Sequence, residues 1–163
     1  MDIFEATEKR MQQIKHRIPK FPLEMMRLLR MTYQIQKNMR DRINAALKEH
    51  DLHDGSYIIL AVLFGSDNET STASALGMAC HEKPANLTRV CNELEARGLI
   101  VRGARPGDRR SVMISLTGKG RELIERALPA VWESTVPTYD GFSASELEQL
   151  TTMSVRQLHN IAS

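Results

Sequence analysis

Apolar residues recur three and four positions apart over most of this chain, a period that predicts amphipathic helices. The long helices predicted in this way cover residues 2–17, 23–49, 55–64, 84–97 and two stretches that follow Thr117 and Ser143. A shorter helix, with Ser71 or Thr72 as its cap, ends at Ala79. After Gly98 the pattern changes, because residues 99–102 and 111–116 are short runs rich in β-forming residues. The chain is therefore predicted to be mainly α with a small β-hairpin.

Several of these helices have polar or special residues that suit their ends. Asp54 is placed to cap the helix over 55–64, and Thr117 to cap the one that follows the hairpin. Ser143-Ala144-Ser145-Glu146 has the spacing of a capping box, so a last helix should start there. Pro129 lies inside the preceding helix and should kink it, because proline removes a backbone hydrogen bond.

The terminal helices need a cover for their apolar stripes. The first places Phe4, Met11, Ile14 and Ile18 on one side, with charged residues between them. A lone amphipathic helix must bury such a stripe, and a partner subunit is the expected cover, with folding back on its own chain as the alternative. We therefore expect N-terminal helices at 1–50 and C-terminal helices at 121–163 to build a dimerisation lobe around a central unit at 51–120.

The helix over 84–97 has two distinct faces. Its apolar face consists of Leu87, Val90, Cys91 and Leu94. Its opposite face consists of Ala85, Arg89, Asn92 and Ala96. A helix whose outward face is small and polar can lie in a DNA major groove, where arginine bonds guanine and asparagine bonds adenine. With the short helix that ends at Ala79, this helix predicts a helix-turn-helix.

The hairpin after this helix is rich in arginine. Residues 103–108 are turn-forming residues that join the two predicted strands. On and around the turn lie Arg102, Arg105, Arg109 and Arg110. Only solvent or a polyanion is expected to satisfy so many guanidinium groups at one place. A helix-turn-helix followed by such a hairpin is a winged helix.

The charge of the chain is concentrated in the same stretch. Residues 83–121 hold nine Lys and Arg against three Asp and Glu, a net charge of +6, whereas the whole chain carries +2 and the remainder therefore −4. A basic patch on a nearly neutral protein is typical of nucleic-acid binding and argues against general binding to membranes.

Length and composition are those of one globular domain. The chain has 163 residues, 42% hydrophobic and 26% charged, and no apolar run approaches the roughly 18 residues of a membrane span. Because residues 1–20 are charged throughout, they do not resemble a signal peptide. We expect a cytoplasmic protein.

Two cysteines do not make a disulfide framework. Cys91 lies on the apolar face of its helix, which favours a core role. Cys80 lies in the presumed turn and is expected to be the more exposed thiol. His81 lies beside Cys80, but two cysteines and one histidine without further spaced ligands are a weak signal for a metal site. No catalytic motif or cofactor signature is present.

The residues of the central unit also resemble a known family. The run Leu87-Thr88-Arg89, then Leu94-Glu95-x-x-Gly98-Leu99-Ile100-x-Arg102, Asp108-Arg109-Arg110 and Leu116-Thr117-x-x-Gly120 is similar to the signature of the MarR family of bacterial transcription regulators. Leu128-Pro129 and the N-terminal half are most similar to its EmrR/MprA-type repressors of multidrug efflux genes. Lys83 departs from the serine that many relatives have before the proline, which trades a cap for a cation near phosphate.

The resemblance implies a homodimeric repressor that a small aromatic or lipophilic ligand releases from double-stranded DNA. It implies that Arg110 enters the minor groove and that Asp108 holds it in place. The residues expected to contact DNA are Lys83, Pro84, Asn86, Thr88, Arg89, Asn92, Arg105, Asp108, Arg109 and Arg110. The residues expected to contact the ligand are Met25, Met26, Leu29, Tyr33 and Tyr57.

Two other interpretations remain open from the sequence. In the first, Cys80 is a redox sensor whose oxidation releases DNA. In the second, the protein is an enzyme or a binding module whose basic hairpin docks a partner. The absence of a catalytic signature argues against the enzyme.

Overall fold

The computed structural model describes residues 4–105 and 108–162. At residues 105 and 108–111 it describes the backbone alone, without the side chains. The helices are α1 Glu5–Arg17, α2 Leu23–Leu47, α3 Asp54–Phe64, α4 Ala73–Ala79, α5 Pro84–Ala96, α6 Gly118–Thr135 and α7 Ala144–Ala162. Short 3-10 turns lie at η1 Lys48–His50, η2 Asp67–Glu69 and η3 Val136–Tyr139. The strands are β1 Thr70–Thr72, β2 Ile100–Arg105 and β3 Asp108–Leu116. The predicted fold class, mainly α with a small β-hairpin wing, is confirmed.

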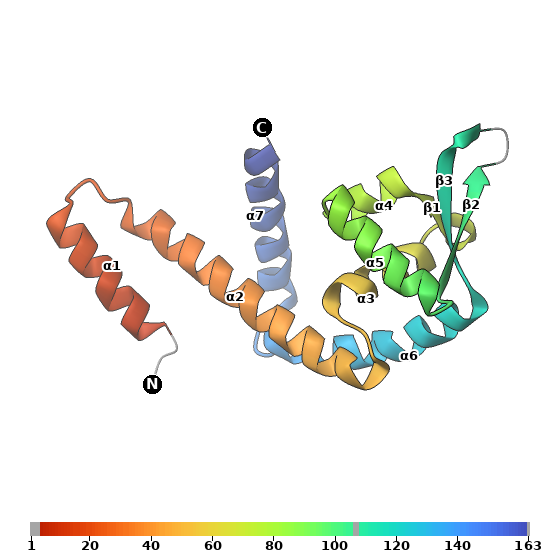
Figure 1. Ribbon diagram of the computed structural model, residues 1–163. Coiled ribbons are helices and arrows are strands. Elements are labelled where there is room, and N and C mark those ends of the chain that lie inside the picture. The colour runs from red at the N-terminus through yellow and green to blue at the C-terminus, as the bar shows by residue number, and fades with distance from the viewer. Residues whose placement is uncertain (1–3, 106–107, 163) are drawn as a thin grey trace.

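The molecule has a packed lobe and a set of extended helices (Figure 1). The packed lobe contains α3, α4, α5, the hairpin of β2 and β3, and the first part of α6. From it α2 runs outward to α1, while α7 stands apart from α3, α4 and α5 (Figure 1). The DNA-binding elements predicted from the sequence therefore lie together, and the terminal helices lie to one side of them.

The core fills the packed lobe. Its fully buried side chains include Leu47, Ile59, Leu60, Leu63, Leu76, Leu94, Leu99, Ile100, Ile114 and Ile124. They come from α2, α3, α4, α5, both strands of the hairpin and α6, so each of these elements is fixed by its contacts with the others. Such contacts hold α5 rigidly with respect to the hairpin, as a reading helix requires.

The sheet is larger than the sequence predicted. Its three strands lie in the order β1-β3-β2, and β1, at Thr70–Thr72, was not expected. Thr70 pairs with Ser115 and donates a hydroxyl hydrogen bond to the Ile114 carbonyl at 3.1 Å. The predicted turn over 103–108 is too long, since β2 continues to Arg105 and β3 begins at Asp108. Regular pairing between strands overrides the turn preference of Gly103 and Ala104.

The cap of α3 also differs from the prediction. His53, not Asp54, is the N-cap: its Nδ1 accepts from the Ser56 backbone N–H at 3.3 Å, and Ser56 Oγ accepts from the His53 N–H at 3.0 Å. The Asp54 carboxylate instead lies 3.2 Å from Arg40 Nε on α2. The other predicted caps, Thr72, Thr117 and Ser143 with Glu146, are confirmed.

A close backbone contact joins the start of α6 to the start of β2. A Cβ atom added at Gly120 would lie 2.1 Å from the Leu99 carbonyl oxygen, so no larger residue fits there. That same oxygen accepts a hydrogen bond from the Thr117 backbone at 3.1 Å and another from the Thr117 hydroxyl at 3.0 Å. Lys119 Nζ donates to the Arg97 carbonyl at 2.8 Å. The hairpin and α6 are thus joined by direct backbone approach.

The terminal helices bury little of their apolar surface. On α1, Met11 is buried against α2, whereas Ile14 and Ile18 are exposed. Arg27 of α2 fixes α1 by two hydrogen bonds to Glu8, of 2.8 and 2.5 Å. Every residue of α7 is exposed. Folding back on the chain therefore buries Met11 and partly covers Phe4, and it leaves Ile14 and Ile18 exposed. Pro129 lies inside α6, and its kink stays a prediction.

Candidate nucleic-acid interface

The two faces of α5 are those predicted. Leu87, Val90, Cys91 and Leu94 are its buried residues. Ala85, Arg89, Asn92 and Ala96 are exposed. Pro84 occupies the first turn, where its missing N–H costs nothing, and the N-cap Lys83 makes no side-chain cap. The apolar contacts hold α5 in place, and its polar face is presented to solvent.

The polar face of α5 carries a line of hydrogen bonds that ends near a histidine. Asn86 Nδ2 donates to Glu82 Oε2 at 2.7 Å, and Asn86 Oδ1 accepts from Arg89 at 2.9 and 3.3 Å. Arg89 Nη1 donates to Glu93 Oε1 at 2.5 Å. His53 Nε2, from the cap of α3, lies 3.5 Å from Glu93 Oε2. We name these residues, Glu82, Asn86, Arg89, Glu93 and His53, the α5 chain.

Sequence reasoning found two members of the α5 chain and missed the other three. Asn86 and Arg89 were expected to contact DNA, but no role was expected for Glu82, Glu93 or His53. The i, i+4 spacing of Arg89 and Glu93 was a usable signal, because side chains four residues apart meet on a helix. No sequence signal joins His53 to Glu93, since they lie on different helices.

The sequence suggested that Arg102 points into solvent, but in the structure its side chain is bonded to α5. Its Nη1 donates to Asn92 Oδ1 at 2.7 Å and to Glu95 Oε2 at 2.8 Å. Its side chain is 27% exposed. One arginine of the hairpin therefore binds α5 and not solvent. Asn92 was expected to contact DNA, and its side-chain oxygen already accepts a hydrogen bond from this arginine.

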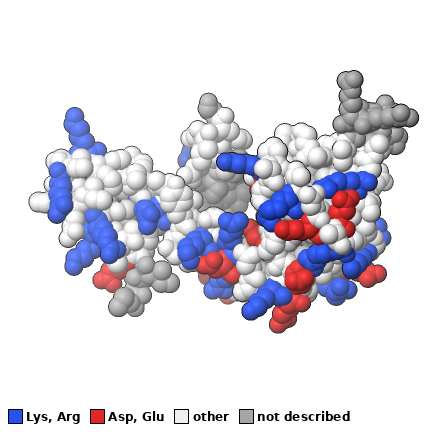
Figure 2. Space-filling model, in the orientation of Figure 1, with Lys and Arg blue, Asp and Glu red and all other residues white. Residues whose placement is uncertain are grey.

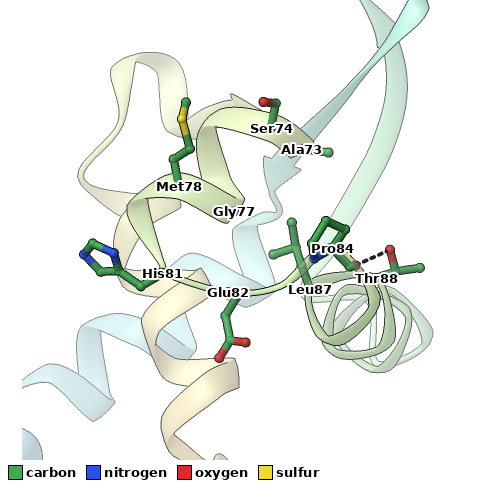
Figure 3. Close-up of a pocket in the computed structure, with 9 residues that line it drawn as sticks. All are labelled: Ala73, Ser74, Gly77, Met78, His81, Glu82, Pro84, Leu87 and Thr88. Atoms are coloured by element: carbon green, nitrogen blue, oxygen red, sulfur yellow. Dashed lines mark hydrogen bonds between the residues drawn. The ribbon is translucent and has the colours of Figure 1, made fainter. Parts of the chain in front are cut away.

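Thr88 uses its hydroxyl locally. The Oγ1 donates to the Pro84 carbonyl at 2.8 Å, and the side chain remains exposed (Figure 3). It lies at the edge of a pocket of about 660 Å³ between α4 and α5. The pocket is lined by Ala73, Ser74, Gly77, Met78, His81, Glu82, Pro84, Leu87 and Thr88. Because it opens between the two helices of the helix-turn-helix, it belongs to the same surface as the start of α5.

The hairpin places the remaining expected residues along its two strands. Arg105 ends β2, and Asp108, Arg109 and Arg110 begin β3. The side chains of these four residues lie outside what the structure describes, so their expected contacts with DNA stay predictions. The backbone does place them at the far end of a wing beside α5 (Figure 1).

Charge on the packed lobe is mixed rather than uniformly basic. Figure 2 shows Lys and Arg lying beside Asp and Glu over this lobe. Four of its basic residues have acidic partners within 4 Å: Arg89 with Glu93, Arg97 with Asp51, Arg102 with Glu95 and Arg121 with Glu69. Hydrogen bonds from Arg121 hold the pKa of Glu69 below its usual value. The number of unpaired Lys and Arg side chains on this surface is therefore smaller than the net charge of residues 83–121 suggests.

The residues expected to bind a ligand are not gathered at one pocket. Four of them lie on α2: Met25, Met26, Leu29 and Tyr33. The fifth, Tyr57, lies on α3 and packs against the core. Only Met26 lines a pocket described here, a small one of about 260 Å³ between α1 and α2. Burial raises the pKa of the Tyr57 hydroxyl. Met25, Leu29 and Tyr33 recur every four residues on α2 and Tyr57 lies on another helix, and the contacts of these residues with a ligand stay a prediction.

Cys80 is buried, contrary to the expectation that it is the exposed thiol. It is 7% exposed, and burial raises its pKa to about 11. Cys91 is buried as predicted, and burial raises its pKa as well. The sequence placed Cys80 in a turn, but the residue ends α4 with its side chain toward the core. A reactive thiolate needs the opposite environment.

Among the described residues, no group of three His, Cys, Asp or Glu side chains is placed to hold a metal ion. None of the helices described is both long and apolar enough to cross a bilayer.

Comparison with known proteins matches this chain to transcription regulators. A family model described as "Transcriptional regulator SarA/Rot" matches residues 42–127, which include the whole winged helix. The transcriptional repressor MprA of Escherichia coli K12 is 28% identical over 141 residues, covering 86% of this chain and 80% of MprA.

Solved structures share the fold as well. CouR from Rhodococcus jostii RHA1, bound to p-coumaroyl-CoA, is 26% identical with a TM-score of 0.69, covering 76% of this chain and 85% of CouR. Sco3205 from Streptomyces coelicolor, a MarR family transcriptional regulator in complex with DNA, has a TM-score of 0.79 at 18% identity, covering 85% of this chain and 91% of Sco3205. These are proteins that this chain is similar to.

Proposed function

This chain belongs to the MarR family of transcriptional regulators, and from that premise we propose that it is a homodimeric repressor released from its operator by a small ligand. The observation that carries the proposal is the exposed polar face of α5 beside a two-stranded wing. A helix of this kind enters a major groove, and a wing beside it reaches the neighbouring minor groove. The protein acts in the cytoplasm and is a regulator, not an enzyme.

The proposed contacts with DNA divide by role. Asn86, Thr88 and Arg89, near the start of α5, contact bases or phosphates, with Pro84 and Asn92 at the same surface. Lys83 and Arg109 contact phosphates, because a cation at the turn or on the wing lies beside the backbone of the duplex. Arg110 enters the minor groove, supported by Asp108, and Arg105 lies next to it on the wing.

A homodimer is supported by the exposed apolar surface of the terminal helices. Leu147, Leu150, Met153, Val155, Leu158 and Ile161 on α7 are all exposed, as are Leu28, Met31 and Ile35 on α2. Exposed apolar patches of this kind mark sites of protein–protein contact, and a second copy of the chain is the proposed cover. A second copy places two α5 helices about 34 to 36 Å apart, one turn of DNA.

The ligand is proposed to be an aromatic or lipophilic compound. The crystal structure of the similar protein CouR shows it bound to p-coumaroyl-CoA, an aromatic thioester. Met25, Met26, Leu29 and Tyr33 on α2, with Tyr57 on α3, are the proposed contacts, brought together when a second copy covers α2. A ligand that prefers a different spacing of the α5 helices by about 1.4 kcal/mol changes operator occupancy tenfold. Genes for efflux or for the response to aromatic compounds are the proposed targets.

The alternative trigger, oxidation of Cys80, is disfavoured by burial. With a pKa near 11, almost none of this thiol is ionised at neutral pH. Peroxide should therefore leave operator binding of the wild type and of Cys80→Ser equal and unchanged. Release of the wild type alone would restore the redox interpretation.

A footprint on the DNA upstream of its own gene tests the proposed function. We expect protection of a nearly palindromic site with two half-sites one helical turn apart. Arg110→Ala should weaken binding to that site while leaving the melting temperature and the dimer unchanged. No protected site, or operator affinity of Arg110→Ala within twofold of the wild type, would contradict the operator or the wing contact respectively.

A further inference from the structure

The polar face of α5 holds one carboxylate beside the arginine that is expected to contact a base. Glu93 is 47% exposed; one of its oxygens accepts a hydrogen bond from Arg89 of α5, and the other lies 3.5 Å from Nε2 of His53, the N-cap of α3. We propose that Glu93 is a specificity-determining residue that keeps Arg89 directed at base edges and away from phosphates. This inference rests on the proposed function, since it requires that α5 lies on DNA.

The hydrogen bonds of Arg89 leave it with the donors that a base contact needs. A guanidinium group has five N–H donors, one on Nε and two on each terminal nitrogen. In the structure Nε and Nη2 donate to Asn86 and Nη1 donates to Glu93. One N–H on Nη1 and one on Nη2 therefore remain. Two such donors match the O6 and N7 acceptors of guanine in a bidentate contact.

A contact with phosphate would require a different arrangement. Arg89 must swing away from α5 to reach the backbone of a duplex, and it then loses Asn86 and Glu93. The Glu93 carboxylate would be left without its cation and would face a polyanion, which repels it. On random DNA phosphates are the main contact available. Glu93 therefore weakens binding to random DNA more than binding to the operator.

The rest of the α5 chain holds this arrangement from both ends. Asn86 donates to Glu82, so its amide oxygen is turned toward Arg89. At the other end, the Nδ1 atom of His53 accepts the cap hydrogen bond of α3, which turns its Nε2 atom toward Glu93. His53 is thus a positioning residue for Glu93. The guanidinium group is oriented before DNA is met.

Glu93→Gln tests the proposal, because it keeps the shape of the side chain and removes its charge. Affinity is measured for the operator duplex found by the footprint and for a random duplex of equal length. We expect random-DNA affinity to rise about fivefold, the size of an exposed ion pair of about 1 kcal/mol, with operator affinity within twofold. The salt dependence of random-DNA binding should steepen by about two in the dimer, one phosphate per subunit.

The control variant is Asp41→Asn. It removes the same charge from an exposed pair of the same spacing, Lys37 with Asp41 on α2, away from α5. Its ratio of operator to random-DNA affinity should equal that of the wild type. A ratio for Glu93→Gln within twofold of the wild type overturns the proposal.

A double mutant separates a role through Arg89 from a general effect of charge. In an Arg89→Ala background, Glu93→Gln should raise operator and random-DNA affinity by the same factor, because only the repulsion between the carboxylate and the phosphates is left to relieve. A change of more than twofold in the ratio of operator to random-DNA affinity in that background also overturns the proposal. If the wild type shows no preference for any operator, the proposed function fails and this inference falls with it. If the wild type prefers its operator and Glu93→Gln keeps the same preference, the proposed function stands and only the role of Glu93 is contradicted.

Discussion

The packed lobe and the terminal helices use apolar side chains in opposite ways. In the part of the chain that the structure describes, every buried apolar residue except Met11 lies between Leu47 and Val131. On α7, by contrast, Leu158 is 64% and Ile161 is 75% exposed. Both regions consist of amphipathic helices with the same period of apolar residues. The difference shows that this period predicts a helix with one apolar face but not where the cover of that face comes from.

The largest expected effect comes from breaking the packed lobe. Leu60 is completely buried in α3, so Leu60→Ala should lower the free energy of unfolding by about 2 to 5 kcal/mol. The matched change Leu158→Ala on α7 removes the same atoms from an exposed position, and in a monomer it should cost under about 0.5 kcal/mol. Urea titration of both variants at low protein concentration measures this. If both variants lost the same free energy of unfolding, the proposed difference between the packed lobe and the terminal helices would be contradicted.

A second change should affect only the terminal helices. Leu150→Glu with Leu158→Glu places two charges on the apolar stripe of α7, and we expect the dimer dissociation constant to rise at least a hundredfold, about 2.7 kcal/mol. Sedimentation equilibrium measures the constant, and circular dichroism should show a folded winged helix. The control, Gln149→Glu with Thr152→Glu, adds the same charge to the opposite face of α7 and should leave the dimer intact. A dimer that tolerates both pairs would place the interface elsewhere.

A third change sharpens the comparison inside the packed lobe. Arg102→Ala removes the side-chain hydrogen bonds from Arg102 to Asn92 and Glu95 and leaves Glu95 without its cation, while the hydrogen bond from the residue's backbone N–H to Glu95 remains. We expect a loss of about 1 to 2 kcal/mol in the free energy of unfolding and a weaker operator complex, with an unchanged dimer. Arg97→Ala, which breaks the more exposed pair with Asp51, is the control and should cost less. An operator affinity equal to that of the wild type would show that the wing is positioned without Arg102.

The smallest expected effect concerns the attachment of α1. Hydrogen bonds from Arg27 lower the pKa of Glu8 from 4.5 to about 2. A lowered pKa means that the ionised form is favoured by the fold, so this stabilisation is complete above about pH 4.5 and is lost as the pH falls through 2. Amide hydrogen exchange across that range should show α1 losing protection before α3. Glu8→Gln should show the same early exchange at neutral pH, whereas Asp41→Asn should not.

Sequence reasoning worked best where one helix face decides the outcome. The buried and exposed residues of α5 are those predicted, because its three-and-four spacing leaves a single way to bury four apolar residues. It failed where two segments distant in sequence meet. The strand β1 forms because Thr70 pairs with Ser115, and Arg102 is satisfied by Asn92 and Glu95 on another element.

Local errors have a different cause. Asp54 was preferred as a cap by residue type, yet Arg40 of α2 pairs with its carboxylate, and His53 with Ser56 completes the capping box. Cys80 was expected in an exposed turn, but the end of α4 turns it toward the core. In each case a tertiary contact chose between residues that the sequence could not rank.

The backbone contact between Gly120 and Leu99 has a mechanical consequence. Because α6 has no side chain at Gly120 and rests on the carbonyl of Leu99, the helix and the base of the hairpin have no room to slide past each other. The far end of α6 leads through η3 to α7. A tilt of the part of α6 that precedes Pro129 would therefore turn the base of the hairpin with it. A ligand acting among the terminal helices would need no contact near DNA to turn the wing out of its groove.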